Sequence, residues 1–179
     1  MKKVVAILAT GLLFAVLAIG CGQEPNEPAA NGNLSSFTAQ SVQGETITQD
    51  ILADYDLTMI NIWATWCGPC VQEMPELQEV SLKAPDNVNV IAICIDADQE
   101  TALAQQILSD SGATFTTLIG NKELGDKLTN YVSGFPTTVF VDSKGNLVGK
   151  ALSGTPGRPG QITDGYLKLI NESLELLGA

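Results

Sequence analysis

One stretch of the chain constrains the fold more than any other, because an apolar strand leads within a few residues into a helix. Residues 58–64 read TMINIWA, a mostly apolar run that predicts a strand buried on both faces. From residue 70, apolar side chains recur at approximately helical spacing, and Pro75 inside this run is expected to kink the helix. Cys67 and Cys70 lie at the junction, so the fold has to hold two thiols between a strand end and the first turn of a helix.

Strands and helices alternate along the rest of the sequence, with polar turns between them. In chain order the predicted elements are a β-hairpin at 37–52 with its turn at 43–45, the strand at 58–64, the helix from 70, a strand at 87–96, a helix at 98–112, a hairpin of 134–142 with 146–152 around Gly145, and an amphipathic helix at 164–177. This order predicts one α/β domain over 35–179, with helices layered on a central sheet that the last hairpin makes mixed.

The N-terminal residues form a separate unit. Residues 1–20 combine two lysines, an apolar run that is short for a membrane helix, and a closing glycine, which is typical of a secretory signal peptide. The sequence LAIGC resembles the end of a bacterial lipoprotein signal, and this resemblance implies that Cys21 carries a lipid and becomes the mature N-terminus. An uncleaved signal anchor is the alternative. Residues 21–34, rich in Pro, Gly, Asn and Glu, predict a flexible tether.

The composition excludes several classes of function. Nine Lys and Arg residues stand against 20 Asp and Glu, a formal net charge of −11, which argues against binding nucleic acid or an anionic membrane through a basic patch. The chain has no histidine, which removes histidine-based acid–base catalysis and the commonest metal ligand. Beside Cys67 and Cys70 the mature chain keeps Cys94 alone as a further thiol, so a zinc site with about four ligands is not expected.

The spacing of Cys67 and Cys70 favours redox chemistry. A structural disulfide across Gly68 and Pro69 would add little stability, because the stabilisation falls with the length of the closed loop. The N-terminus of a helix stabilises a thiolate, and Pro69 fits a first helical turn. One thiolate can then attack a substrate disulfide, and the second cysteine can resolve the mixed disulfide.

Two motifs carry a resemblance to a known family. WCGPC, followed by a proline five residues after the second cysteine, resembles the thioredoxin site, and GFPTTVFVD resembles the cis-proline loop of that fold. With the lipoprotein leader and the FTAQSVQGETIT hairpin, residues 35–179 resemble the TlpA/ResA branch of the thioredoxin superfamily. The resemblance implies a thioredoxin-like α/β/α sandwich with a central mixed β-sheet and an N-terminal β-hairpin, and the activity of a thiol-disulfide oxidoreductase.

The resemblance also implies roles for individual residues. Cys67 would be the nucleophile and Cys70 the resolving thiol. Pro136 would be cis and lie beside the disulfide, with the backbone of Phe135 pairing to the bound substrate chain. Trp66 is expected to form a contact surface for the substrate. The full set expected to bind substrate is Trp66, Gly68, Pro69, Phe135 and Pro136. Trp63 is expected in the core, and Cys94 is expected to be a small buried residue, with a role as a third redox thiol as the alternative.

Glu73 is the acidic residue of most interest. It lies one helical turn after Cys70, and ResA-like proteins carry a glutamate at the matching position, which implies proton exchange with the buried Cys70 and tuning of the thiol pKa. A partly buried carboxyl would have a raised pKa, as this role requires. The alternative is a solvated helix glutamate, which is how we read Glu76 and Glu79. Asn61 stands where thioredoxin has a buried aspartate, which strengthens the case for Glu73.

Gly68-Pro69 is the dipeptide found in thioredoxin, and it predicts a reductase rather than an oxidant. We expect a lipid-anchored monomer on the extracytoplasmic side of a bacterial cell membrane, with protein disulfides and thiols as substrates. The family implies reduction of apocytochrome c cysteines or electron supply to a repair enzyme. No cofactor or metal is expected, so a separate membrane thiol reductase has to donate electrons. A disulfide oxidase or isomerase with the same site, a peroxidase and a non-catalytic binding lipoprotein remain as alternatives.

Overall fold

The computed structural model describes residues 33–178, so the predicted leader, Cys21 and most of the tether lie outside the described residues. Within 33–178, no helix has the length and apolar character needed to cross a membrane. Leu34, the last residue of the predicted tether, already belongs to the fold. Its side chain is buried and its N–H donates to the carbonyl of Gly145 at 2.7 Å, so Leu34 is part of the folded domain.

The central sheet is mixed, as predicted from the alternation of strands and helices. Its strands are β3 (Leu57–Trp63), β4 (Val88–Cys94), β5 (Thr117–Ile119), β6 (Thr137–Asp142) and β7 (Leu147–Ser153). They lie in the order β5-β4-β3-β6-β7; β3, β4 and β5 run parallel, and β6 and β7 are antiparallel to their neighbours. The predicted N-terminal hairpin is a separate two-stranded sheet of β1 (Thr38–Gln40) and β2 (Thr46–Thr48), followed by the short helix η1 (Gln49–Leu52).

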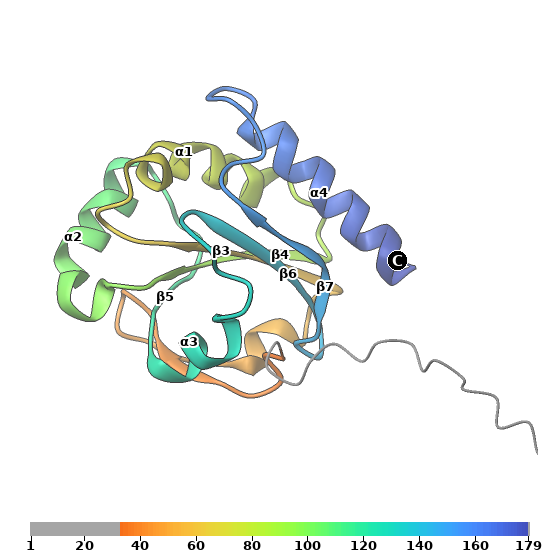
Figure 1. Ribbon diagram of the computed structural model, residues 1–179, viewed down its shortest axis with the longest axis horizontal. Helices are drawn as coiled ribbons and strands as arrows, with labels where there is room; N and C mark the ends of the chain where they lie inside the picture. The colour runs from red at the N-terminus through yellow and green to blue at the C-terminus, as the bar shows by residue number, and fades with distance from the viewer. Residues whose placement is uncertain (1–32, 179) are drawn as a thin grey trace, which may run out of the picture.

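Helices cover both faces of the sheet (Figure 1). One face carries α1 (Gly68–Lys83), α2 (Ala97–Asp110) and α4 (Ile162–Leu177), whose buried side chains share a core with one side of the strands. The other face carries α3 (Lys122–Leu128) together with the hairpin and η1, and this side has a second core. The predicted α/β/α layering is therefore confirmed.

The position of β3 in the middle of the sheet explains why its sequence is almost continuously apolar. All of its residues are buried, because alternate side chains point into the two cores. Met59 and Trp63 join the core beneath α1 and α4, whereas Ile60 and Ile62 join the core beneath α3. Asn61 lies on the same face of β3 as Met59 and Trp63, so this polar side chain points toward α1 and α4.

The predicted order of elements lacked β5 and α3, which both lie between α2 and β6. β5 has three residues, too few to show a periodic pattern, and α3 has Gly125 inside it, a residue that lowers helix propensity. α1 is one continuous helix from Gly68 to Lys83 with Pro75 inside it on an exposed face, and the kink expected at Pro75 stays a prediction.

Candidate redox site

The two cysteines lie where the strand–helix junction predicted them. Cys67 is the N-cap of α1 with an extended backbone, Cys70 lies in the first turn, and the two form a disulfide. Pro69 occupies the start of the helix, where its missing N–H leaves no hydrogen bond unmade. Cys70 is completely buried and Cys67 is 5% exposed, so Cys67 is the sulfur that a substrate can approach.

A carboxylate from the neighbouring strand anchors the loop that carries Cys67. Asp96, just after β4, accepts hydrogen bonds from the Thr65 N–H at 3.0 Å and from the Thr65 hydroxyl at 2.6 Å. Burial alone would raise the pKa of Asp96, but these bonds outweigh it and lower the pKa. The Cys94 thiol also donates to Asp96, at 3.2 Å. Burial and the nearby carboxylate raise the pKa of Cys94 to about 12, and the side chain is buried, as expected of a small core residue.

The predicted substrate-binding residues gather around the disulfide. The ring of Trp66 is 67% exposed and meets Phe135 edge to face, with 5.7 Å between the ring centroids. The Phe135–Pro136 peptide bond is cis, as the resemblance implied. Gly68 and Pro69 are exposed beside Cys67. The fold therefore brings the WCGPC motif and the cis-proline loop to one surface. Trp63 is fully buried, as expected of a core residue.

Glu73 is fully buried, so the reading of Glu73 as a solvated helix residue is wrong. Its Oε1 accepts from the Asn61 amide at 2.9 Å, and its Oε2 accepts from the Tyr166 hydroxyl at 3.0 Å. The Thr138 hydroxyl in turn donates to Tyr166 at 3.1 Å. The carboxyl group is thus held by side chains from β3 and α4, and β6 supports the contact from α4.

The buried position of Glu73 changes its acidity. Desolvation raises its pKa from 4.5 to about 7, and the negative charge of Glu76 contributes in the same direction. The hydrogen bonds from Asn61 and Tyr166 favour the carboxylate and limit this rise. A group with this pKa exchanges a proton readily near neutral pH. Sequence reasoning found Glu73 through its spacing from Cys70, but it did not find Tyr166.

Glu76 is not a solvated helix residue, contrary to the prediction. Its carboxylate accepts from the backbone N–H groups of Gly160, Ile162 and Thr163 at 2.8, 2.8 and 3.1 Å, so it caps the N-terminus of α4. Burial would raise its pKa, but these backbone bonds outweigh it and lower the pKa. Glu76 thereby ties α1 to α4. Glu79 does lie at the surface, paired with Lys83.

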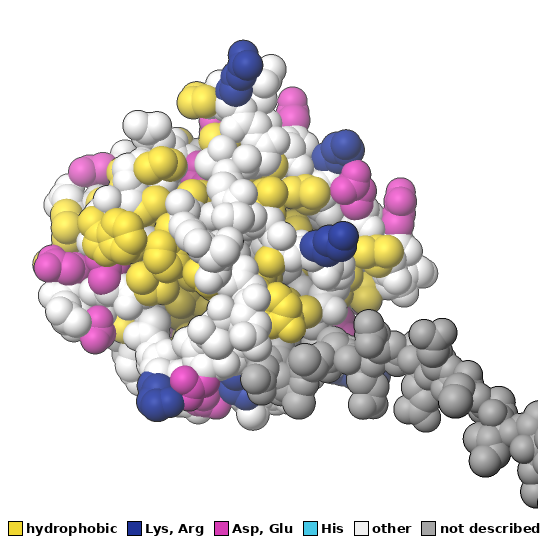
Figure 2. All heavy atoms as spheres, in the orientation of Figure 1, with side chains coloured by type: hydrophobic (Ala, Val, Ile, Leu, Met, Phe, Trp, Pro, Cys, Tyr) yellow, Lys and Arg dark blue, Asp and Glu magenta, His cyan; other side chains and the backbone are white. Residues whose placement is uncertain are grey.

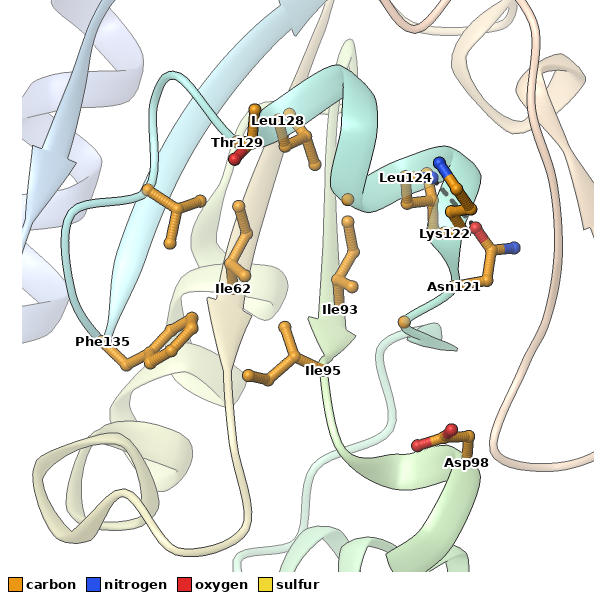
Figure 3. A pocket seen from close by; sticks show the side chains of 13 residues that line it. Ile62, Ile93, Ile95, Asp98, Asn121, Lys122, Leu124, Leu128, Thr129 and Phe135 are labelled. Carbon is orange, nitrogen blue, oxygen red and sulfur yellow. Dashed lines mark hydrogen bonds between the residues drawn. The ribbon is translucent and has the colours of Figure 1, made fainter.

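A groove of about 500 Å³ lies between Phe135 and α3; its lining is apolar near Phe135, and Asp98, Asn121 and Lys122 line its other end. Figure 3 shows Phe135 pointing toward Ile62, Ile93 and Ile95 at the ends of β3 and β4, with Leu124 and Leu128 of α3 opposite. On the surface, Figure 2 shows hydrophobic side chains gathered on the left of the view, where β3 and β4 lead to α1 and α2 in Figure 1. Phe135 therefore joins the surface around Cys67 to an apolar depression. Within 33–178 no cluster of side chains has the composition of a metal site.

Comparisons with known proteins agree with this geometry. The family described as Redoxin matches residues 28–164. The thiol-disulfide oxidoreductase ResA of Bacillus anthracis is 25% identical over 171 residues, 94% of each chain. The thioredoxin-like protein YneN of Bacillus subtilis (strain 168) is 32% identical over 111 residues, 61% of this chain and 63% of that relative, so the chain matches less than two thirds of it. A thioredoxin-family thiol:disulfide interchange protein from Chlorobium tepidum TLS has the same fold, with a TM-score of 0.66 at 21% identity over 83% of this chain and 99% of that chain.

Proposed function

This chain belongs to the Redoxin family and is a thiol-disulfide oxidoreductase of the thioredoxin superfamily, and from that premise we propose that it reduces disulfides of client proteins outside the cytoplasm. The observation that carries the proposal is the Cys67–Cys70 disulfide at the start of α1, with the buried carboxyl group of Glu73 one turn behind it. The nucleophile is accessible, the resolving sulfur is buried, and a proton acceptor lies on the same side of the helix.

The reaction has two thiol-disulfide exchanges. The Cys67 thiolate of the reduced protein attacks one sulfur of the client disulfide, a bond forms between them, and the other client sulfur leaves as a thiolate. Cys70 then loses its proton and attacks the Cys67 sulfur. The Cys67–Cys70 bond forms, the bond to the client breaks, and the second client thiolate leaves. Two electrons pass from the dithiol to the client, so the client is reduced and this protein is oxidised.

Glu73 takes the proton of Cys70 in the second exchange. Its raised pKa, about 7, makes it a better proton acceptor than an ordinary surface carboxylate and still leaves it partly ionised near neutral pH. The same carboxylate opposes a second negative charge on Cys70, which favours the disulfide over the thiolate form. Gly68 and Pro69 add no charge that would stabilise a thiolate. Both features support the reducing direction.

The client chain binds along the exposed residues that surround Cys67. The backbone of Phe135 pairs with the extended client, and the ring of Trp66 packs against client residues next to the disulfide. The groove beneath α3 accepts an apolar client side chain, because Phe135 belongs both to the groove and to the Trp66 contact. The exposed ring of Trp66 offers a large apolar area to a client chain.

The N-terminal sequence supports a location for the reaction on the extracytoplasmic side of the membrane. Residues 1–20 act as the lipoprotein signal, Cys21 carries the lipid, and the polar stretch that follows holds the domain away from the membrane surface. In an oxidising compartment, a reductase keeps selected thiols reduced. Suitable clients are the haem-binding cysteines of apocytochrome c or a thiol-dependent repair enzyme, and a membrane thiol reductase returns electrons to the Cys67–Cys70 disulfide. The protein acts as a monomer.

Trapping of the mixed disulfide tests the proposal. The reduced protein is mixed with oxidised insulin as a model client, and products are separated without reductant after alkylation. The native chain is expected to reduce insulin and to end as the Cys67–Cys70 disulfide, whereas Cys70→Ser stops as a covalent adduct with an insulin chain and Cys67→Ser forms no adduct. An adduct with Cys67→Ser, or reduction of insulin by that variant, would contradict the assignment of the nucleophile.

A further inference from the structure

A group of buried polar side chains lies behind the disulfide, and it includes residues that the exchange reactions do not use. Asn61 comes from β3, Glu73 from α1, Thr138 from β6 and Tyr166 from α4, and all four are buried. Asn61 and Thr138 are direct cross-strand partners, which places their side chains side by side. A buried polar group is costly when it lacks a hydrogen-bond partner. The carboxyl group of Glu73 therefore needs hydrogen bonds both when it is ionised and when it is protonated.

The two side chains that contact Glu73 differ in what they can do. The Asn61 nitrogen that meets Glu73 Oε1 is a donor only, so it suits the carboxylate. The Tyr166 hydroxyl can donate or accept, and it lies between Glu73 Oε2 at 3.0 Å and the Thr138 hydroxyl at 3.1 Å. Burial raises the pKa of Tyr166, so this hydroxyl keeps its proton throughout. Tyr166 is therefore a neutral link between an ionisable group and a second hydroxyl.

We propose that Tyr166 is a positioning residue whose hydroxyl reverses direction when Glu73 gains or loses a proton, with Thr138 as its alternate acceptor. The inference rests on the proposed proton exchange between Glu73 and Cys70. When Glu73 is ionised, Tyr166 donates to Oε2 and accepts from Thr138. When Glu73 is protonated, its O–H donates to Tyr166, and Tyr166 donates to Thr138 instead. One proton is added at Oε2, the two hydroxyl hydrogens rotate, and no heavy atom has to move.

The reversal keeps Glu73 paired in both states, which is what a buried proton acceptor needs. Asn61 from β3 and Tyr166 from α4 contact Glu73, and Thr138 from β6 lies behind Tyr166. On α1 itself the charged group that acts on Glu73 is Glu76, and Cys70, one helical turn away, is held in the disulfide of the oxidised protein. The charge of Glu76 favours the protonated state, and the Asn61 donor favours the ionised state. Tyr166 can hydrogen-bond to Glu73 whether the carboxyl group is ionised or protonated, so it does not strongly favour either protonation state.

Two substitutions are expected to shift the pKa of Glu73 in opposite directions. Tyr166→Phe removes a donor to the carboxylate, so the pKa is expected to rise by about one unit. Thr138→Val removes the alternate acceptor, so Tyr166 can donate only to Glu73, the carboxylate is favoured and the pKa is expected to fall. Thr138→Ser keeps a hydroxyl, and Tyr55→Phe changes a tyrosine that lies before β3, so neither is expected to shift it.

The measurement is a pH titration of the Glu73 carboxyl by ¹³C NMR, on the oxidised full-length chain labelled at glutamate, with Glu73→Gln used to assign the resonance. Opposite shifts in Tyr166→Phe and Thr138→Val support the reversal. If the pKa of Glu73 shifts in the same direction in both variants, the reversal is wrong, because a loosened core admits water and lowers the pKa in each. If neither variant shifts the pKa, the reversal is also wrong. If Tyr166→Phe does not fold, Thr138→Val decides, because a rise or no change contradicts the proposal.

The pH profile of insulin reduction separates this inference from the proposed function on which it rests. If Glu73 accepts the Cys70 proton, the profiles of both variants move in the direction of their NMR pKa values. If the NMR values shift as expected but the profiles do not move, the hydroxyl reversal holds and the role of Glu73 in the exchange fails. If the profile of Glu73→Gln alone changes, and the NMR values of the two variants do not, the role of Glu73 holds and the reversal fails.

Discussion

Replacement of Glu73 by glutamine is expected to stabilise the oxidised protein above neutral pH and to have little effect in acid. Glutamine has nearly the same shape and can keep hydrogen bonds to Asn61 and Tyr166, but it cannot ionise. In the folded protein desolvation raises the pKa of Glu73 from 4.5 to about 7. The folded state therefore binds this proton more tightly than the unfolded state does.

The sign and size of the effect follow from that difference. The raised pKa contributes stability that is fully present below pH 4.5 and is lost as pH rises toward 7. The difference of 7 − 4.5, about 2.5 pKa units at roughly 1.36 kcal/mol per unit, corresponds to about 3 kcal/mol. Glu73→Gln avoids this loss, so its advantage in free energy of unfolding is expected to grow by about 2–3 kcal/mol between pH 5 and pH 8.

Urea denaturation of both proteins at pH 5 and pH 8 measures this advantage, with the fluorescence of the buried Trp63 as the probe. Glu79→Gln is the matched control, because Glu79 is an exposed glutamate of the same helix and its replacement is expected to show no such growth with pH. An equal difference between the native and Glu73→Gln proteins at the two pH values would show that folding does not raise the pKa of Glu73. A variant that is less stable than the native chain at pH 8 would contradict the expected gain in stability.

Three further outcomes are expected. Glu76→Ala leaves the first N–H groups of α4 without their acceptor. Urea denaturation is expected to show a free energy of unfolding lower by about 1–2 kcal/mol. A change below about 0.3 kcal/mol would mean that water replaces the carboxylate as the acceptor. Trp66→Ala is expected to slow insulin reduction several-fold and to leave the reduction of a small aromatic disulfide nearly unchanged, and equal slowing of both would show that Trp66 acts on the cysteines themselves. Cys94 is buried and its pKa is raised, so iodoacetamide at pH 8 is not expected to label it in the native oxidised protein. In urea the same reagent is expected to label it. Labelling without urea at the rate of a free thiol would contradict its buried environment.

The parts of the site that sequence reasoning predicted are those set by local spacing. Cys67 and Cys70 are three residues apart at a strand–helix junction, and Glu73 follows at the next helical turn, so their relation depends on α1 alone. The apolar runs of β3 and β4 were likewise visible, because a strand buried on both faces needs no partner to be recognised. The isomer of the Phe135–Pro136 bond came from the family resemblance, since spacing carries no information about it.

The parts that were missed depend on packing between distant segments. Tyr166 follows Glu73 by 93 positions, and the helix that carries it looks like any amphipathic helix until α1 and α4 are packed together. Asn61 was noted only as a departure from an aspartate, whereas its amide contacts Glu73, Thr138 and Tyr166. Glu76 shows no local sign of its role, because the N–H groups that it binds begin 84 positions later.

The reduction potential of the Cys67–Cys70 pair decides whether this protein reduces or oxidises its clients. The purified protein is equilibrated with thiol/disulfide buffers of defined potential, and the oxidised fraction is measured by thiol trapping and by the fluorescence of Trp66 beside Cys67. A reductase is expected to remain oxidised until the buffer approaches the potential of thioredoxin, about −270 mV. Reduction already near about −180 to −120 mV, the range of disulfide isomerases and oxidases, would contradict the account and make this protein an oxidant of its clients.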